Sequence, residues 1–358
     1  MSDPFDDEDG GALAAEKAVA SIPLPRENAV LVGQDQAEAA LLKAYHSGRL
    51  PHAWLLTGRR GIGKASLAFR FARFLLAQSA GGGLFAALPT LAVDEKAPVF
   101  RRVASGGHAD LLLIEKAYDQ KRKRYRSEIV VEDVRAIGDF LHLTPAEAGW
   151  RIVIVDGADE MNRNAANALL KVLEEPSRRS LLLITSASPG VLPPTLRSRC
   201  RHLALRVLSD AQITDLLRQF HPSLESHELG PLVRLAEGSI GRALELAGSG
   251  GVELYRTMVA MLARRPGLDP LALHGFADRL ARADAEESYR AFEELLRQHL
   301  ARQAVDAARA GHREEAARWA SLRDDIGHEF ARGDGLNLDR KQTILSAFFA
   351  IERAADAR

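Results

Sequence analysis

One stretch, residues 53–78, constrains the fold of this chain more than any other. It begins with the short apolar run Ala53–Thr57, continues through the glycine-rich segment Gly58–Lys64, and ends in a segment whose apolar residues recur every three or four positions. A short apolar run bounded by glycine is typical of a buried strand in a parallel sheet, and the later period is that of a half-buried helix. The stretch therefore predicts a strand, a loop and a helix in succession.

The loop has the spacing Gly-x-x-x-x-Gly-Lys of a phosphate-binding loop. Gly58, Gly63 and Lys64 provide this spacing, and Gly61 lies between them. Free backbone N–H groups at the helix start, the helix dipole and the lysine would all converge on one anion. A glycine turn that only joins strand to helix is the alternative, but the position between a buried strand and an amphipathic helix favours phosphate binding. We therefore expect these four residues to form a nucleotide site.

A nucleotide hydrolase of this kind needs a metal ligand and a water-activating base at two positions. In this chain both positions hold residues that can do neither. The residue after the lysine normally gives a hydroxyl to Mg²⁺, and here it is Ala65. A second run, Arg151–Asp156, predicts a buried strand with a carboxylate at its C-terminal end, and this carboxylate of Asp156 would orient the metal and its waters. Gly157 stands where a water-positioning Glu would follow. We expect a weak or vestigial nucleotide site that holds no metal of its own.

Other residues leave hydrolysis open. Asp159 and Glu160 follow the second strand closely, where an acidic side chain either activates water or interacts with the positive end of a helix dipole. Ser66 or a water molecule could replace the hydroxyl that Ala65 lacks. An active ATPase is therefore the alternative to a silent site, and nucleotide binding without hydrolysis is the third possibility.

The alternation of strands and helices continues as far as about residue 206. Further apolar runs predict strands at 110–114 and 181–186, and amphipathic patterns predict helices at 35–47, 132–141 and 162–174. Residues 80–107 show turn signals and no strong period, so we expect them to be irregular. Strands that alternate with helices form a parallel sheet, which places this part of the chain in the α/β class.

From about residue 207 no strand pattern remains and the sequence is helical. We therefore expect an acidic tail at 1–27, an α/β domain at 28–206, a small helical domain at 207–250 and an all-α domain at 251–358.

Composition limits the classes of partner. Lys and Arg total 48, as do Asp and Glu, so no global positive field exists to hold nucleic acid, and any DNA contact needs a local patch or partners. The basic stretch Gln120–Arg126 is either such a patch or a solvated loop, and the solvated loop is the simpler interpretation. No apolar run reaches the roughly 18–20 residues of a membrane span, and the acidic N-terminus is unlike a signal peptide. We expect a cytoplasmic protein with no membrane partner.

Arg199 is a candidate for action on another molecule. It follows a loop after a predicted strand, flanked by Ser198 and Cys200, and a guanidinium at such an edge could stabilise a phosphate held by a neighbouring subunit. The alternative is a surface arginine in a basic run with Arg197 and Arg201. Cys200 is the single cysteine, which excludes an intrachain disulfide and a multi-cysteine zinc site, and we expect it to be a small buried residue.

Several segments together resemble the delta-prime family of bacterial DNA polymerase III clamp-loader subunits. These segments run in order between about residues 29 and 353 and are Leu31–Gln34, Arg49–Ala53, the degenerate loop at 58–65, Asn167–Pro176, Leu196–Cys200 and Asn337–Arg340. The resemblance implies an AAA+ base domain, a helical lid and a helical collar that closes a five-subunit ring with gamma/tau and delta subunits. It also implies that the gamma/tau neighbours hydrolyse ATP to open the sliding clamp and place it on primed DNA.

The resemblance assigns roles to individual residues. Arg199 matches the family's arginine finger, which acts across an interface on a neighbour's ATP. Gly241 stands where an active gamma/tau subunit has its lid arginine, with Arg242 one residue later, which weakens nucleotide sensing. Many relatives carry a four-cysteine zinc module after the first helix, and residues 99–108 contain no cysteine, so we expect no zinc.

The function implied by the resemblance is that of a non-hydrolysing delta-prime subunit, a component of the DNA polymerase III holoenzyme in DNA replication that requires no cofactor of its own. An active gamma/tau-type ATPase is the alternative.

Overall fold

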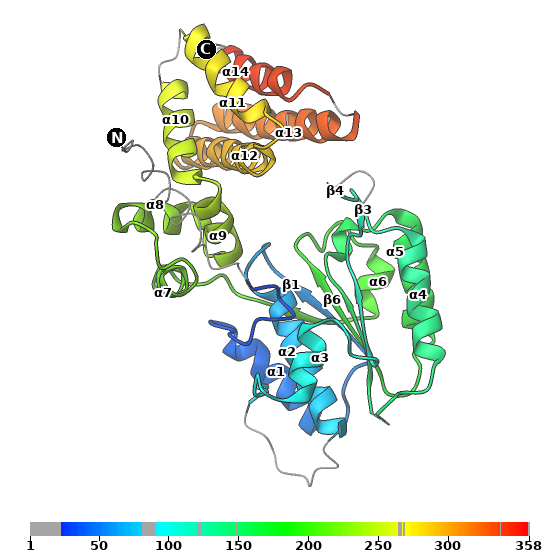
Figure 1. Cartoon of the computed structure of the whole chain (residues 1–358). Coiled ribbons are helices and arrows are strands. Elements are labelled where there is room, and N and C mark those ends of the chain that lie inside the picture. Colours follow the sequence, from blue (N-terminus) through cyan, green and yellow to red (C-terminus); the bar gives the residue numbers. More distant parts are fainter. Residues whose placement is uncertain are drawn as a thin grey trace, which may run out of the picture. The chain divides into compact units, whose positions relative to one another are not determined.

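The computed structural model describes residues 23–80, 90–119, 124–147, 149–263, 267, 269–336 and 338–356 (Figure 1). The chain divides into two compact units, Met1–Ser223 with Glu237–Arg242, and Leu224–Ala236 with Ala243–Arg358. Most of the acidic tail, residues 1–22, lies outside the described residues. The domain boundaries given above remain predictions.

The first unit is built on a five-stranded parallel sheet in the order β2-β5-β6-β1-β7. Its strands are β1 (Ala53–Thr57), β2 (Leu111–Ile114), β5 (Arg151–Val155), β6 (Ser180–Ser186) and β7 (Arg201–Ala204). β1 pairs with β6 on one side, with Ala53 opposite Leu182, and with β7 on the other, with Thr57 opposite Ala204. The α/β class and the four predicted strands are confirmed.

The sequence pattern predicts no strand at 201–204, and this prediction is wrong. β7 lies at the edge of the sheet, where Arg201, His202 and Ala204 are exposed and Leu203 is half-buried. An edge strand with one paired side needs no continuous apolar run, so the pattern that reveals buried strands is missing here. The pairing is completed where the backbone N–H of Leu205 donates to the carbonyl of Thr57 at 2.8 Å.

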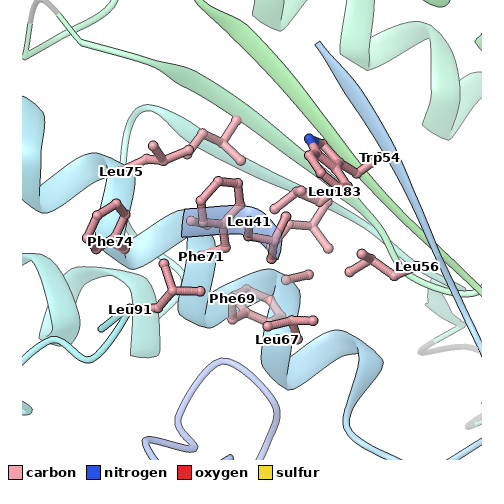
Figure 2. Packing of buried hydrophobic residues seen from close by; sticks show 14 of the residues in the cluster. Leu41, Trp54, Leu56, Leu67, Phe69, Phe71, Phe74, Leu75, Leu91 and Leu183 are labelled. Carbon is pink, nitrogen blue, oxygen red and sulfur yellow. The ribbon is translucent and has the colours of Figure 1, made fainter. Parts of the chain in front are cut away.

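Helices cover both faces of this sheet. They are α1 (Asp35–His46), α2 (Lys64–Ala80), α3 (Pro98–Ala104), α4 (Val131–His142), α5 (Arg163–Glu174) and α6 (Pro194–Ser198), with a 3₁₀ turn η1 (Ala158–Glu160) after β5. A further helix, α7 (Asp210–Phe220), follows β7. Alternate residues of β1 belong to different buried clusters. Trp54 and Leu56 pack with α1, α2 and α3, whereas Leu55 packs with α4, α5 and α6. Figure 2 shows Trp54 and Leu56 in one cluster with residues of α1 and α2.

α3 corrects the expectation that residues 80–107 are irregular. Pro98 occupies the start of this helix, where its fixed φ favours a first turn, and Val99, Phe100 and Val103 are buried. The guanidinium of Arg73 lies over the Phe100 ring, 4.5 Å from its centroid. Seven residues are too few to show a helical period, so α3 depends on these tertiary contacts.

The second unit is helical throughout the part that the structure describes, which confirms the all-α prediction. Its helices are α8 (Ser226–Ala236), α9 (Ile240–Gly248), α10 (Gly251–Ala263), α11 (Pro270–Ala281), α12 (Glu286–Arg309), α13 (Arg313–Leu336) and α14 (Arg340–Asp356), with the first three residues of α9 assigned to the first unit. Aromatic rings join these helices, since the ring centroid of Phe292 lies 5.4 Å from that of Phe276 and 6.0 Å from that of Phe348. Among the described residues, no helix combines the length and the apolar character that a membrane crossing requires.

Candidate functional site

The glycine-rich segment forms a tight loop between β1 and α2. Gly58, Gly61 and Gly63 have φ values of +141°, +73° and +100°, a region that L side chains rarely adopt. A Cβ on Gly58 would lie 2.6 Å from a methyl of Ile62 and 3.1 Å from the carbonyl oxygen of Leu205, so a side chain there would displace its neighbours. The predicted strand, loop and helix are therefore present, and the loop places its backbone at the N-terminus of α2, as an anion site requires.

Lys64 is buried at the first turn of α2 and closes this loop. Its ammonium donates to the carbonyls of Gly58 at 2.8 Å and Arg59 at 2.7 Å. Burial lowers the pKa of Lys64, while the charges of Asp156 and Asp159 act in the opposite direction. The lysine thus lies in the electrostatic surroundings of the carboxylate predicted to belong to the same site.

Asp156 follows β5 and is held by a residue that no sequence motif predicts. The hydroxyl of Thr185, on the neighbouring strand β6, donates to Asp156 Oδ1 at 2.6 Å and accepts from the backbone N–H of Gly157 at 2.9 Å. Burial raises the pKa of Asp156, and the hydrogen bond from Thr185 and the charge of Lys64 counteract that rise. A threonine directly after the apolar residues Leu181–Ile184 of β6 is the sequence signal that could have revealed it.

The position after Asp156 is built for glycine. Gly157 has a φ of +80°, and a Cβ there would lie 2.9 Å from a carboxylate oxygen of Glu160. The acidic residues considered as replacement bases have structural partners: Asp159 accepts from the backbone N–H groups of Ala187 and Ser188 at 3.1 and 3.0 Å. Glu160 accepts from the ammonium of Lys116 at 3.0 Å.

The segment 237–242 lies directly against the glycine loop. The backbone N–H of Gly241 donates to the carbonyl of Gly61 at 2.9 Å, and the Ser239 hydroxyl donates to the carbonyl of Arg60 at 2.7 Å. A Cβ on Gly241 would lie 2.8 Å from the Cα of Gly61. The backbones at Gly241 and Gly61 therefore approach so closely that position 241 has no room for an arginine side chain.

Arg199 lies at the C-terminal end of α6, away from the glycine loop in sequence and just before β7. Its guanidinium donates to the carbonyl of Thr195 at 3.0 Å and pairs with Glu174, with 2.8 Å between Nη2 and Oε1. The Arg199 side chain is 37% exposed. The guanidinium is thus accessible at the surface but held in one position by groups from α5 and α6.

The two residues that flank Arg199 have structural roles. The Ser198 hydroxyl donates to the carbonyl of Thr195 at 3.0 Å. Cys200 is buried in the cluster formed with α4, α5 and α6, and burial raises the pKa of its thiol to about 12. A thiol that remains protonated at neutral pH is a poor nucleophile, which confirms that Cys200 is a small buried residue.

Comparison with known proteins adds to this geometry. Residues 33–209 match the family model described as DNA polymerase III, delta subunit. The chain is 35% identical over 201 residues to DNA polymerase III subunit delta' of Pseudomonas aeruginosa, which covers 56% of each chain. It is 33% identical over 226 residues to DNA polymerase III subunit tau of Escherichia coli K12, which covers 62% of this chain and 32% of that protein. The match to each of these relatives thus spans between about a third and just over half of the relative's length.

A crystal structure of a gamma subunit-related protein from Thermotoga maritima aligns with 88% of this chain and 99% of that chain, with 18% sequence identity and a TM-score of 0.41. The fold is defined by the sheet topology given above.

Proposed function

The chain belongs to the clamp-loader AAA+ family of DNA polymerase III subunits, and on this premise we propose that it is a delta-prime-type subunit that does not hydrolyse ATP itself. One observation carries the proposal: the nucleotide loop lacks both the metal-binding hydroxyl and the catalytic base, whereas Arg199 is retained at the surface. Such a chain would support catalysis at a neighbour's site and not at its own.

The residues around the loop support the proposal that the chain does not hydrolyse ATP, because none of them replaces the missing metal ligand or base. Ala65 offers a methyl group where Mg²⁺ needs an oxygen ligand. Gly157 has a positive φ that disfavours the Glu of an active enzyme, so a single substitution there would be strained. Asp159 and Glu160 are occupied by backbone amides and by Lys116, respectively, which argues against a substitute base.

The proposed role in the complex is to supply Arg199 in trans. A guanidinium that reaches a phosphate across a subunit interface stabilises the charge that develops during phosphoryl transfer, an effect worth about 10³–10⁵ in rate. We infer a five-subunit ring in which gamma/tau subunits hydrolyse ATP and a delta subunit completes the assembly. In this scheme the helices of residues 251–358 form the collar, and the complex loads the sliding clamp onto primed DNA in the cytoplasm as part of the polymerase III holoenzyme.

The proposal includes a vestigial nucleotide site. The loop's backbone N–H groups and Lys64 fit a phosphate, so ATP could bind weakly, but the residue set does not fit a tightly held Mg²⁺. No cofactor and no zinc would be required for function.

An active gamma/tau-type ATPase is the second candidate, favoured by the 33% identity to tau over 226 residues. Measurement of ATP turnover by the purified chain separates the two. The delta-prime proposal expects no turnover above that of Lys64→Ala, whereas turnover that is lost in Lys64→Ala would support the ATPase. Binding of a fluorescent ATP analogue with and without Mg²⁺ then distinguishes a vestigial site from one that binds no nucleotide.

Reconstitution of the clamp loader with and without this chain tests the role in the complex. The proposal expects DNA-stimulated ATPase activity and clamp loading to depend on the chain, and full activity in its absence would contradict it.

A further inference from the structure

A small antiparallel hairpin follows β2 and has no part in the chemistry described above. β3 (Tyr118–Asp119) pairs with β4 (Arg124–Tyr125), and Tyr118 stands directly opposite Tyr125 (Figure 1). The two rings meet edge to face, with their centroids 5.2 Å apart and their planes at 77°. The residues are nevertheless 51% and 59% exposed, respectively. The hairpin therefore presents a fixed pair of aromatic rings to solvent.

A cation lies next to the aromatic pair. Arg126 follows Tyr125, its side chain is 48% exposed, and its Nη1 lies 3.9 Å from Oδ1 of Asp133. The other oxygen of Asp133 accepts from the backbone N–H of Val130 at 3.1 Å, so this carboxylate already stabilises the start of α4. An exposed ion pair at this distance is weak, and an anion from another molecule could replace Asp133 as the partner of Arg126.

The local charge is unusual for a chain with no net charge. Residues 120–126 contain five Lys or Arg in seven positions, although residues 120–123 lie outside the described residues and the site is defined without them. Tyrosine pairs also occur at protein interfaces, but positive charge beside exposed rings is more specific to nucleic acid. Bases of every type can stack on an aromatic ring, and arginine pairs with the phosphates between them.

We propose that Tyr118, Tyr125 and Arg126 form a binding site for single-stranded DNA, with bases stacked on the tyrosines and a phosphate at the guanidinium of Arg126. The site is separate from the glycine loop and from Arg199. The proposal therefore does not depend on whether this chain hydrolyses ATP or acts on a neighbour's ATP.

The test is binding of a fluorescently labelled 20-nucleotide oligothymidylate to the full-length chain, followed by anisotropy over a series of salt concentrations. The double variant Tyr118→Ala/Tyr125→Ala should weaken binding about tenfold or more, because the stacking of a base on each ring is lost. Tyr118→Phe/Tyr125→Phe retains the rings and should bind within about twofold of wild type. Phe349→Ala removes a 43% exposed ring from α14 and is the matched control, for which we expect no change.

Arg126→Ala provides an independent measurement. Loss of one phosphate contact should lower the slope of log affinity against log salt by about 0.7, the value for a single strand. Circular dichroism melting would verify that each variant is folded, which the exposure of the three side chains leads us to expect.

Three results would overturn the proposal. They are wild-type affinity in the double alanine variant, no measurable binding by the wild-type chain at low salt, and a salt slope that Arg126→Ala leaves unchanged. Normal DNA binding combined with failure of the alanine variant to assemble with purified gamma/tau and delta subunits would instead assign the tyrosine pair to a protein interface.

Discussion

The guanidinium of Arg199 is bound to the carboxylate of Glu174, with 2.8 Å between Nη2 and Oε1. The pair links the end of α6 to the last residue of α5. Because both side chains are exposed, the ion pair contributes only about 0–1 kcal/mol to the free energy of unfolding. Glu174 therefore orients the arginine, yet little free energy is needed to break the ion pair. The multiple negative charges of a nucleotide could replace Glu174 as the partner of Arg199.

Arg199→Ala should leave the isolated chain folded and reduce the DNA-stimulated ATPase of a reconstituted clamp loader. The site that Arg199 serves is expected to lose about 10³-fold or more in rate, the effect of removing an arginine finger. Arg201→Ala, two residues away on β7, is the matched control and should retain activity. Equal activity in the two variants would exclude the trans role of Arg199.

Ala65→Thr should restore an oxygen ligand and make nucleotide binding stronger in Mg²⁺ than in EDTA. Turnover should still be absent, because Gly157 cannot position water. Ser66→Ala is the control and should leave the affinity for Mg²⁺ and ATP unchanged, since Ser66 is one residue out of register. Titration with a fluorescent ATP analogue measures both effects, and ATP turnover by Ala65→Thr alone would show that a base is present after all.

Gly241→Ala should destabilise the chain by about 1–3 kcal/mol, because its new methyl would lie 2.8 Å from the Cα of Gly61 and would force the two backbones apart. Gly248→Ala, at the other end of α9, meets nothing within 4 Å and should change the free energy of unfolding by less than about 1 kcal/mol. Urea unfolding of both variants provides the comparison. Similar stabilities would argue against a close contact between Gly61 and Gly241.

Cys200 should resist thiol reagents in the native protein at pH 8 and react promptly in denaturant. Burial raises its pKa from 9.0 to about 12, so the native state retains a proton that the unfolded state loses. The contribution of this thiol to stability is therefore constant below about pH 9 and decreases as the pH rises toward 12. Cys200→Ala should remove that part of the alkaline decrease, as urea unfolding between pH 8 and 11 would measure. Rapid native-state labelling at pH 8 would contradict the burial.

The strands that helices cover on both faces could be predicted from sequence. β1, β5 and β6 have nearly unbroken apolar runs for this reason. β7 could not be predicted, because an exposed edge strand such as Arg201–Ala204 has the composition of a loop and is defined only by its pairing with β1. The hairpin of β3 and β4 is likewise too short for an alternating pattern.

The candidate site was predictable where its residues are close in sequence. The spacing of the glycines and Lys64 predicts the phosphate-binding loop, and the position of Asp156 at the end of an apolar strand predicts its place in the site. The hydrogen bond from Thr185 requires knowledge that β5 and β6 are neighbours. The contact of Ser239 with Arg60 joins residues 179 positions apart, a separation over which no local pattern operates.

The pairing of β7 with β1 connects the two functional ends of the first unit. Thr57, at the end of β1, precedes the glycine loop, and β7 begins two residues after Arg199 with Arg201 opposite Trp54. The two paired strands therefore connect the glycine loop at one end with Arg199 at the other. In a subunit that hydrolyses ATP, each cycle of nucleotide binding and release would move these strands. Under the proposed function the loop of this chain is inactive, so these strands would not move and the neighbouring active site would meet an arginine held in a fixed position.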